Sequence, residues 1–170
     1  AKDQLVTLNQ SDLKDHPIVL VTWHEARLYC EWLTQDLRAK GTLSDKYVVR
    51  LPTEAEWEKA ARGEYGKQYP WGDEWDSQRC NSRETGPGRT TPIGTYSPQG
   101  DSPYGVADMA GNILEWCQSR VQSYPYVDSD GREEVSGEEA RVLRGGSFVL
   151  DRGSFRCAYR FRGLPDDRYE

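Results

Sequence analysis

The chain has 170 residues, of which 22 are Lys or Arg and 28 are Asp or Glu, giving a net charge of -6. This acidic excess argues against a nucleic-acid-binding protein, because affinity for phosphate backbones depends on clustered cations. No apolar run approaches the roughly 20 residues that cross a bilayer, and residues 1–10 lack the basic-then-apolar pattern of a signal peptide. We therefore expect one soluble domain. A cytoplasmic location is favoured, and a surface or exported location stays open if the chain is part of a longer protein.

A first helix is predicted to start after Thr22 and to end near Gly41. Thr22 precedes Glu25 by three residues, which is the spacing of a capping box. Gly41 is a typical stop signal at a helix C-terminus. Residues 18–21, just before the cap, are expected to form a short strand or an extended entry. Apolar residues recur at helical spacing on one predicted face: Ala26, Tyr29, Cys30, Leu33 and Leu37.

A second helix has the same start signal. Thr53 precedes Glu56 by three residues, and Gly63 provides the stop. Trp57, Ala60 and Ala61 share one predicted face. Residues 47–51 are β-branched and aromatic enough to predict a strand that leads into this helix.

The rest of the chain is rich in glycine and proline and predicts no further long helix. The acidic stretch 128–139 is expected to be an exposed loop. Residues 155–162 alternate strictly between two faces, which predicts a β-strand. Two early helices followed by small antiparallel sheets and much irregular structure indicate an α+β fold. One face of the predicted strand carries Phe155, Cys157, Tyr159 and Phe161.

Four segments occur in a characteristic order along the chain. They are residues 16–23 leading into 29–32, then 50–63, 104–116 and 141–148, the last containing Arg-Gly-Gly-Ser. Together they resemble the formylglycine-generating-enzyme family, also called sulfatase-modifying-factor domains. The resemblance implies a variant of the C-type-lectin fold formed by a single domain spanning 1–170. It also implies that family elements are lacking at both ends, namely an N-terminal strand and helix and a C-terminal Gly-Phe-Arg-Val strand.

The third of these segments suggests a calcium site. Asp108 and Glu115 bracket a turn that contains Gly111, so side-chain and carbonyl oxygens can converge on a hard cation such as Ca²⁺. The resemblance implies that the carboxylates of Asp108 and Glu115 are ligands, together with the carbonyls of Gly111 and Ile113. The alternative is that the two carboxylates cap turns or pair with arginines. We expect one structural Ca²⁺.

The residues for oxidase chemistry are not found. The resemblance implies that catalytic members bind copper through two cysteine thiolates, the first of them two residues after the aromatic that follows Arg-Gly-Gly-Ser. Here that position is Leu150, and no cysteine lies within 148–156. Iron-dependent relatives use a histidine triad, whereas this chain has only His16 and His24. We therefore expect no copper and favour a protein that is not an enzyme. The cysteines are expected to be buried free thiols, although two disulfides are also possible: Cys30, Cys80, Cys117 and Cys157.

Residues 148–169 are rich in aromatic and arginine side chains, which are favoured at binding hot spots. They also resemble the variable proteins of diversity-generating retroelements, which share this fold and vary in sequence after Arg-Gly-Gly-Ser. We expect a non-catalytic module that binds a protein or another surface ligand through this region. The alternatives are a core role for these aromatics and a formylglycine-generating oxidase that acts on a substrate cysteine with Cys157 and Cys117 or Cys30. The predicted ligand-binding residues are Phe148, Val149, Leu150, Asp151, Gly153, Tyr159, Phe161, Leu164, Asp167 and Tyr169.

Overall fold

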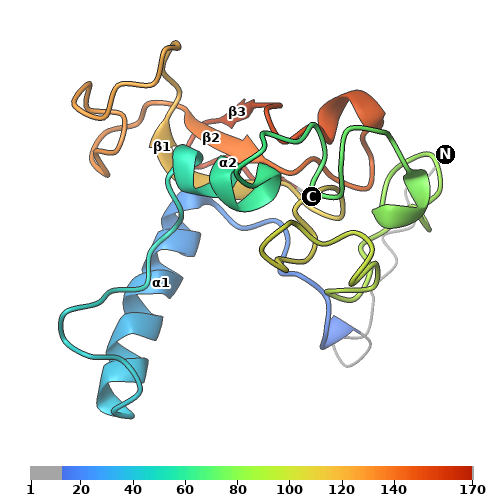
Figure 1. Ribbon diagram of the computed structural model, residues 1–170. Coiled ribbons are helices and arrows are strands. Elements are labelled where there is room, and N and C mark those ends of the chain that lie inside the picture. Colours follow the sequence, from blue (N-terminus) through green and yellow to red (C-terminus); the bar gives the residue numbers. More distant parts are fainter. Residues whose placement is uncertain (1–12, 170) are drawn as a thin grey trace, which may run out of the picture.

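The computed structural model describes residues 13–169, which form two α-helices and one small antiparallel sheet joined by long irregular segments (Figure 1). The predicted α+β class is confirmed. No helix in this range is both long enough and apolar enough to span a membrane. The elements in chain order are α1 (Trp23–Ala39), α2 (Glu54–Arg62), the 3₁₀ helix η2 (Ser77–Arg79), β1 (Glu115–Arg120), β2 (Arg141–Arg144), the 3₁₀ helix η3 (Arg152–Ser154) and β3 (Phe161–Gly163).

The sheet has the order β1-β2-β3, with both strand pairs antiparallel. Leu143 at the centre pairs with Trp116 on one side and with Phe161 on the other. All four residues of β2 are buried, because elements pack on both faces of the sheet. The pairing of β1 with β2 is irregular between Trp116 and Arg120.

Helix α1 is anchored to the sheet by its first turn. Its capping box is present, with Thr22 and Glu25 each bonding the other's backbone N–H. The indole N–H of Trp23 donates to the Cys117 carbonyl at 3.0 Å, and the guanidinium of Arg141 lies 4.1 Å from the Trp23 ring. The remaining turns extend away from the sheet (Figure 1). The predicted apolar face is therefore only half-buried, and Tyr29 on that face is 58% exposed.

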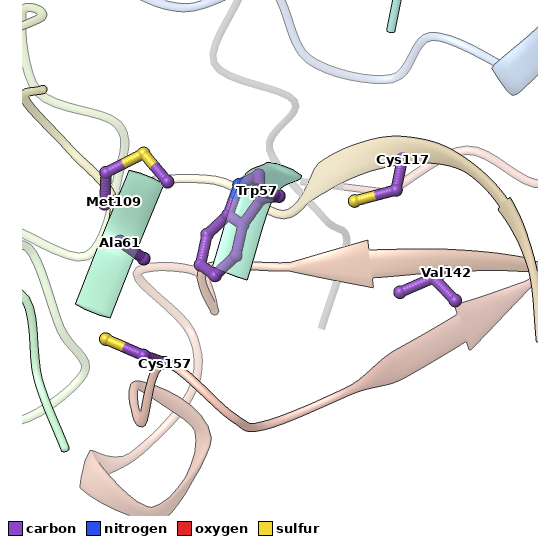
Figure 2. Packing of buried hydrophobic residues seen from close by; sticks show 6 residues of the cluster. All are labelled: Trp57, Ala61, Met109, Cys117, Val142 and Cys157. Atoms are coloured by element: carbon purple, nitrogen blue, oxygen red, sulfur yellow. The ribbon is translucent and has the colours of Figure 1, made fainter. Parts of the chain in front are cut away.

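Helix α2 packs its apolar face onto the sheet. The predicted capping box at Thr53 and the stop at Gly63 are both confirmed, and Gly63 has a positive φ of 67°. Trp57 and Ala61 pack with Met109, Val142 and two cysteines in the cluster shown in Figure 2. A fully buried Trp contributes more apolar area than any other side chain, which explains how a short helix can anchor this core.

A network of buried charges lies beside the same helix. Glu54 and Arg144 are both fully buried and lie 3.3 Å apart. Glu54 also accepts two hydrogen bonds from Arg160, and Arg144 donates to Glu58. Charges removed from water need such partners, since an unpaired one would cost several kcal/mol. The network therefore joins α2 to β2 and to the segment that precedes β3.

Residues 47–51 do not form the strand predicted for them. The N–H of Val49 donates to the Thr34 hydroxyl at 2.9 Å, so a side chain of α1 takes the place of a partner strand for 47–51. Residues 18–21, predicted as a short strand or an extended entry, form no strand, and Leu20 has a positive φ of 58°, so the entry to α1 bends there. The Leu20 N–H donates to the Tyr169 carbonyl, and the carbonyls of Leu20 and Val21 accept from Arg168 and from the Trp116 indole.

The strand predicted for 155–162 is wrong for most of its length. Only Phe161 and Arg162 belong to β3, and the N–H of Tyr159 bonds the Arg156 carbonyl at 2.8 Å in a turn. Phe155 and Cys157 are nevertheless buried, with the exposed Arg156 between them. The alternating pattern therefore indicated which side chains face the core, although turns rather than a strand produce it.

The four cysteines are free, with Cys80, Cys117 and Cys157 buried and Cys30 half-buried. Stretch 128–139 is mostly exposed, as predicted, and the buried Arg132 fixes it to the body by stacking 4.1 Å from the Tyr126 ring.

Candidate functional site

A cavity of about 420 Å³ lies where segments far apart in the sequence meet. We call it the C-terminal pocket. Its walls come from the entry to α1, the residue before β1, the turn after β2, the start of β3 and the end of the chain. The lining residues are Leu20, Leu114, Ser147, Val149, Leu150, Phe161, Arg168 and Tyr169.

Four of the ten predicted ligand-binding residues line this pocket: Val149, Leu150, Phe161 and Tyr169. Two more lie beside it. Asp167 accepts hydrogen bonds from the Tyr169 hydroxyl at 2.7 Å and from the Leu164 N–H at 2.8 Å, which places Leu164 next to Tyr169. Leu164 is 56% exposed and extends the apolar surface outside the pocket.

The other four predicted residues do not line the pocket. Phe148 is buried and its N–H bonds the Asn112 carbonyl. Asp151 caps η3 through the N–H of Gly153 and forms an ion pair with Arg83 at 3.3 Å. Tyr159 is half-buried, and its carbonyl accepts from Arg144. A contiguous stretch of sequence is thus divided between a pocket, a core position and a separate surface.

The glycines of the Arg-Gly-Gly-Ser turn allow a close approach of two backbones. Gly145 and Gly146 have positive φ values of 88° and 79°. The Gly111 N–H bonds the Gly145 carbonyl at 2.8 Å, and a Cβ on Gly146 would lie 3.0 Å from the Phe155 ring. The turn then directs Ser147 into the wall of the pocket. Ser147 is 1% exposed, and its hydroxyl oxygen has no hydrogen-bond partner among residues 13–169.

The one charged residue of the pocket wall is already paired. Arg168 donates to both carboxylate oxygens of Glu25 at 2.8 Å and also to the Leu20 carbonyl. The hydrogen bonds from Arg168, together with one from the Thr22 N–H, lower the pKa of Glu25 to about 2. The pocket therefore offers a ligand an apolar wall with no uncompensated charge, and the unpaired Ser147 hydroxyl is buried within that wall.

The predicted calcium residues lie in a tight loop behind the pocket. Asp108 accepts from the Gly94 N–H at 2.8 Å, and Glu115, the first residue of β1, accepts from the Trp57 indole N–H. The carbonyl of Gly111 accepts from the Ile113 N–H at 2.9 Å. Leu114 in this loop lines the C-terminal pocket.

The donor set of this loop fits a hard cation. Neither Asp108 nor Glu115 pairs with a Lys or Arg in the described part of the chain. Burial raises the pKa of Asp108. The pKa of Glu115 is raised to about 7, chiefly by burial and also by the charge of Asp108, although the hydrogen bond from Trp57 acts in the opposite direction. Two enclosed carboxylates without a cationic partner are the ligands that Ca²⁺ prefers. Asp108 caps a turn through the Gly94 N–H, whereas Glu115 bonds an indole and caps no turn, and the arginine pairs considered as an alternative are not found in 13–169.

A different group of side chains was not indicated by any motif. His24, Glu138 and Asp166 come from three separate segments, and their potential ligand atoms lie within 4.8 Å of one another. All three are at least partly exposed.

The family model described as "Sulfatase-modifying factor enzyme 1-like domain" matches residues 2–170. The chain belongs to this family. It is 38% identical over 156 residues to the serine/threonine-protein kinase pkn1 of Chlamydia pneumoniae, covering 88% of this chain and 22% of that protein. It is 35% identical over 172 residues to the formylglycine-generating enzyme of Streptomyces coelicolor, covering 89% of this chain and 49% of that protein.

A third relative is named "Inactive C-alpha-formylglycine-generating enzyme 2" and comes from Bos taurus, with 35% identity over 146 residues, 79% of this chain and 39% of that protein. Among solved structures, Treponema denticola variable protein 1 superposes with a TM-score of 0.74 at 23% identity, covering 98% of this chain and 71% of that chain. The chain thus spans between about a fifth and a half of the length of these three sequence relatives.

Within this sulfatase-modifying-factor domain, Leu150 lines the pocket at the position where the sequence resemblance implied a first copper thiolate. Burial raises the pKa of Cys80 and of Cys157 to about 12, and raises that of Cys117 further. Figure 2 shows Cys117 and Cys157 apart, on either side of Trp57. The sulfur atoms of the domain therefore form no evident pair of thiolates near the pocket.

The sequence motifs missed half of the pocket wall. Leu20 and Leu114 belong to the motif segments 16–23 and 104–116, but nothing in those segments indicated that they meet residues 148–169 at one pocket. Ser147 and Arg168 could have been found, because Ser147 belongs to the Arg-Gly-Gly-Ser turn and Arg168 stands between two predicted residues.

Proposed function

We propose that this domain is a non-catalytic ligand-binding module that binds a protein or another surface ligand through residues 148–169, centred on the C-terminal pocket. The observation that carries the proposal is the convergence of Val149, Leu150, Phe161 and Tyr169 on one cavity of about 420 Å³. A cavity of this size, apolar with few polar groups, is typical of binding sites.

The side chains of the pocket support binding rather than oxidation. Soft thiolates are the ligands that hold Cu(I), and Leu150 supplies none. The raised pKa of Cys157 keeps this thiol protonated near neutral pH. We therefore propose that the domain binds no copper.

A structural Ca²⁺ in the 108–115 loop would stabilise the pocket from behind. The loop bonds the turn after β2 twice, through the N–H of Gly111 and the carbonyl of Asn112. The proposed ligands are the carboxylates of Asp108 and Glu115 and the carbonyls of Gly111 and Ile113. In this proposal the cation fixes a wall of the site and does not contact the ligand.

The likeness to Treponema denticola variable protein 1 motivates a second part of the proposal, namely that residues 148–169 differ between copies of the gene. Sequencing all copies in the source genome tests it. Substitutions confined to 148–169 are expected, and copies that differ evenly along their length would contradict it.

Selection of displayed peptides tests binding directly. Peptides selected on the wild-type domain should lose at least about tenfold in affinity for Leu150→Asp, since a charge in an apolar pocket lacks a partner. Ile93→Asp is the matched control, because Ile93 is 63% exposed and lies outside the pocket. Equal binding to Leu150→Asp and to wild type would contradict the proposed site.

The oxidase alternative has its own measurement. The domain is mixed with Cu(I) and a cysteine-containing peptide, and oxygen consumption is followed. No consumption is expected. Copper-dependent oxidation of the peptide that disappears in Cys157→Ser would establish the oxidase instead.

A further inference from the structure

A second cavity, of about 440 Å³, has a composition unlike that of the C-terminal pocket. It shares no lining residue with the C-terminal pocket. We call it the tryptophan pocket. Its lining residues are Trp71, Gly72, Asp73, Glu74, Trp75, Asp76 and Arg79.

The two tryptophans of this pocket are held in place by the residues behind them. Trp71 stacks nearly parallel on the buried Tyr69, with ring centroids 5.5 Å apart and planes at 7°. Trp75 packs against Trp71 at 6.0 Å and against Phe155 at 5.4 Å. Both rings are half-buried. They can therefore present an aromatic face to a ligand without first being ordered.

The indole N–H groups are already used. That of Trp71 donates to the Glu74 carbonyl at 3.0 Å, and that of Trp75 donates to the Glu84 carboxylate at 3.2 Å. What the rings offer to a ligand is thus the negative electrostatic potential of their faces, rather than a hydrogen-bond donor. In the described part of the chain no Lys or Arg lies over either ring.

The charges around the rings leave an acidic excess. Asp76 forms an ion pair with Arg79 at 2.9 Å. Asp73 and Glu74 pair with no cationic side chain among residues 13–169, and Asp73 accepts only the Gln68 N–H. Two carboxylates and two aromatic faces are therefore available around one cavity.

We propose that the tryptophan pocket binds an organic cation, specifically an alkylated ammonium group. Aromatic faces attract such cations electrostatically, and the weak hydration of a methylated nitrogen lowers the cost of removing it from water. The carboxylates of Asp73 and Glu74 supply the counter-charge. The cation is either a free molecule of the choline type or a methylated lysine of a partner protein, since both carry the same group.

Calorimetric titration of the full chain with choline, and with its neutral isostere 3,3-dimethyl-1-butanol, tests the role of charge. The two probes have nearly the same shape, so only an electrostatic contribution separates them. Choline should bind at least about tenfold more tightly. Equal affinity of the two probes would overturn the proposal. The proposal would also be overturned if choline showed no saturable binding at concentrations up to roughly 50 mM.

Variants locate the site. The double variant Asp73→Asn with Glu74→Gln keeps the side-chain shapes and should weaken choline binding at least about tenfold. Glu64→Gln is the control, because Glu64 is 73% exposed and outside the pocket, and its affinity should equal that of wild type. An unchanged affinity in the double variant would place the cation elsewhere and refute the assignment.

A trimethyllysine peptide distinguishes the two sources of the cation. Tighter binding of this peptide than of choline assigns the pocket to a partner protein, and the reverse order assigns it to a free ligand. Because neither probe depends on the C-terminal pocket, Val149→Asp should leave both affinities unchanged, since Val149 lines that pocket and is 46% exposed.

Discussion

Two buried serines should respond oppositely to the same truncation. Ser147 is 1% exposed and its hydroxyl oxygen has no partner among residues 13–169. Ser119 is fully buried, and its hydroxyl accepts from the Glu54 N–H at 2.8 Å and donates to the Glu133 carboxylate at 2.6 Å. A buried hydroxyl without a partner costs about 1–3 kcal/mol, so Ser147→Ala should raise the free energy of unfolding by about 1 kcal/mol. Ser119→Ala should lower it by about 2–4 kcal/mol, because one neutral and one charged hydrogen bond are lost.

The difference between the two variants is then at least about 3 kcal/mol, which for a chain of this size separates their Tm values by roughly 6–12 °C. Urea and thermal unfolding of wild type and both variants measure it. A Ser147→Ala protein less stable than wild type would refute the reasoning, since it would mean that this hydroxyl is already bonded in the free protein. A stability gain from Ser147→Ala together with a stability loss from Ser119→Ala is therefore the full expected result.

Three further outcomes are expected. Ca²⁺ at a hundredfold excess over its Kd should stabilise the wild type by about 2.7 kcal/mol, and Glu115→Gln should abolish this shift in a thermal melt; equal shifts in both proteins would exclude the proposed ligand. Arg144→Met should destabilise the protein by about 3–5 kcal/mol in urea unfolding, because the buried Glu54 would lose one of its two arginine partners. Arg162→Met is the control, and because Arg162 is exposed this variant should change the stability little. The pKa of Glu25 is lowered from 4.5 to about 2, so its ion pair stabilises the fold above pH 4.5 and this contribution is lost as the pH falls towards 2. Glu25→Gln should accordingly flatten the acid limb of the stability curve, and an unchanged limb would contradict the pairing.

The parts of the fold that depend on local chemistry could be predicted from the sequence. Both capping boxes and both glycine stops are present as expected, because each involves residues within one helical turn. The strands were harder to predict from the sequence. Residues 47–51 have strand composition, but the Thr34 side chain occupies their hydrogen-bonding edge. That contact depends on where α1 lies, which no local pattern encodes.

The candidate site shows the same division. The Arg-Gly-Gly-Ser motif located the turn that carries Ser147, and the region after it supplied five of the eight residues of the pocket wall. Leu20 and Leu114 complete that wall through tertiary contacts alone. Asp151 and Gly153 are close to Leu150 in sequence, but Asp151 caps a 3₁₀ helix outside the pocket and Gly153 belongs to that helix. Residues that are contiguous in the sequence therefore do not form one surface here, because a turn and a short helix place them on different sides of the domain.

The buried arginines at both ends of β2 restrict how this strand can pair. Arg141 and Arg144 are fully buried and enclose Val142 and Leu143 between them. A slip by one position would exchange the two faces of the strand and separate both guanidinium groups from their acceptors. A shift of the strand register by one residue is therefore strongly unfavourable, even though only four residues make up the strand.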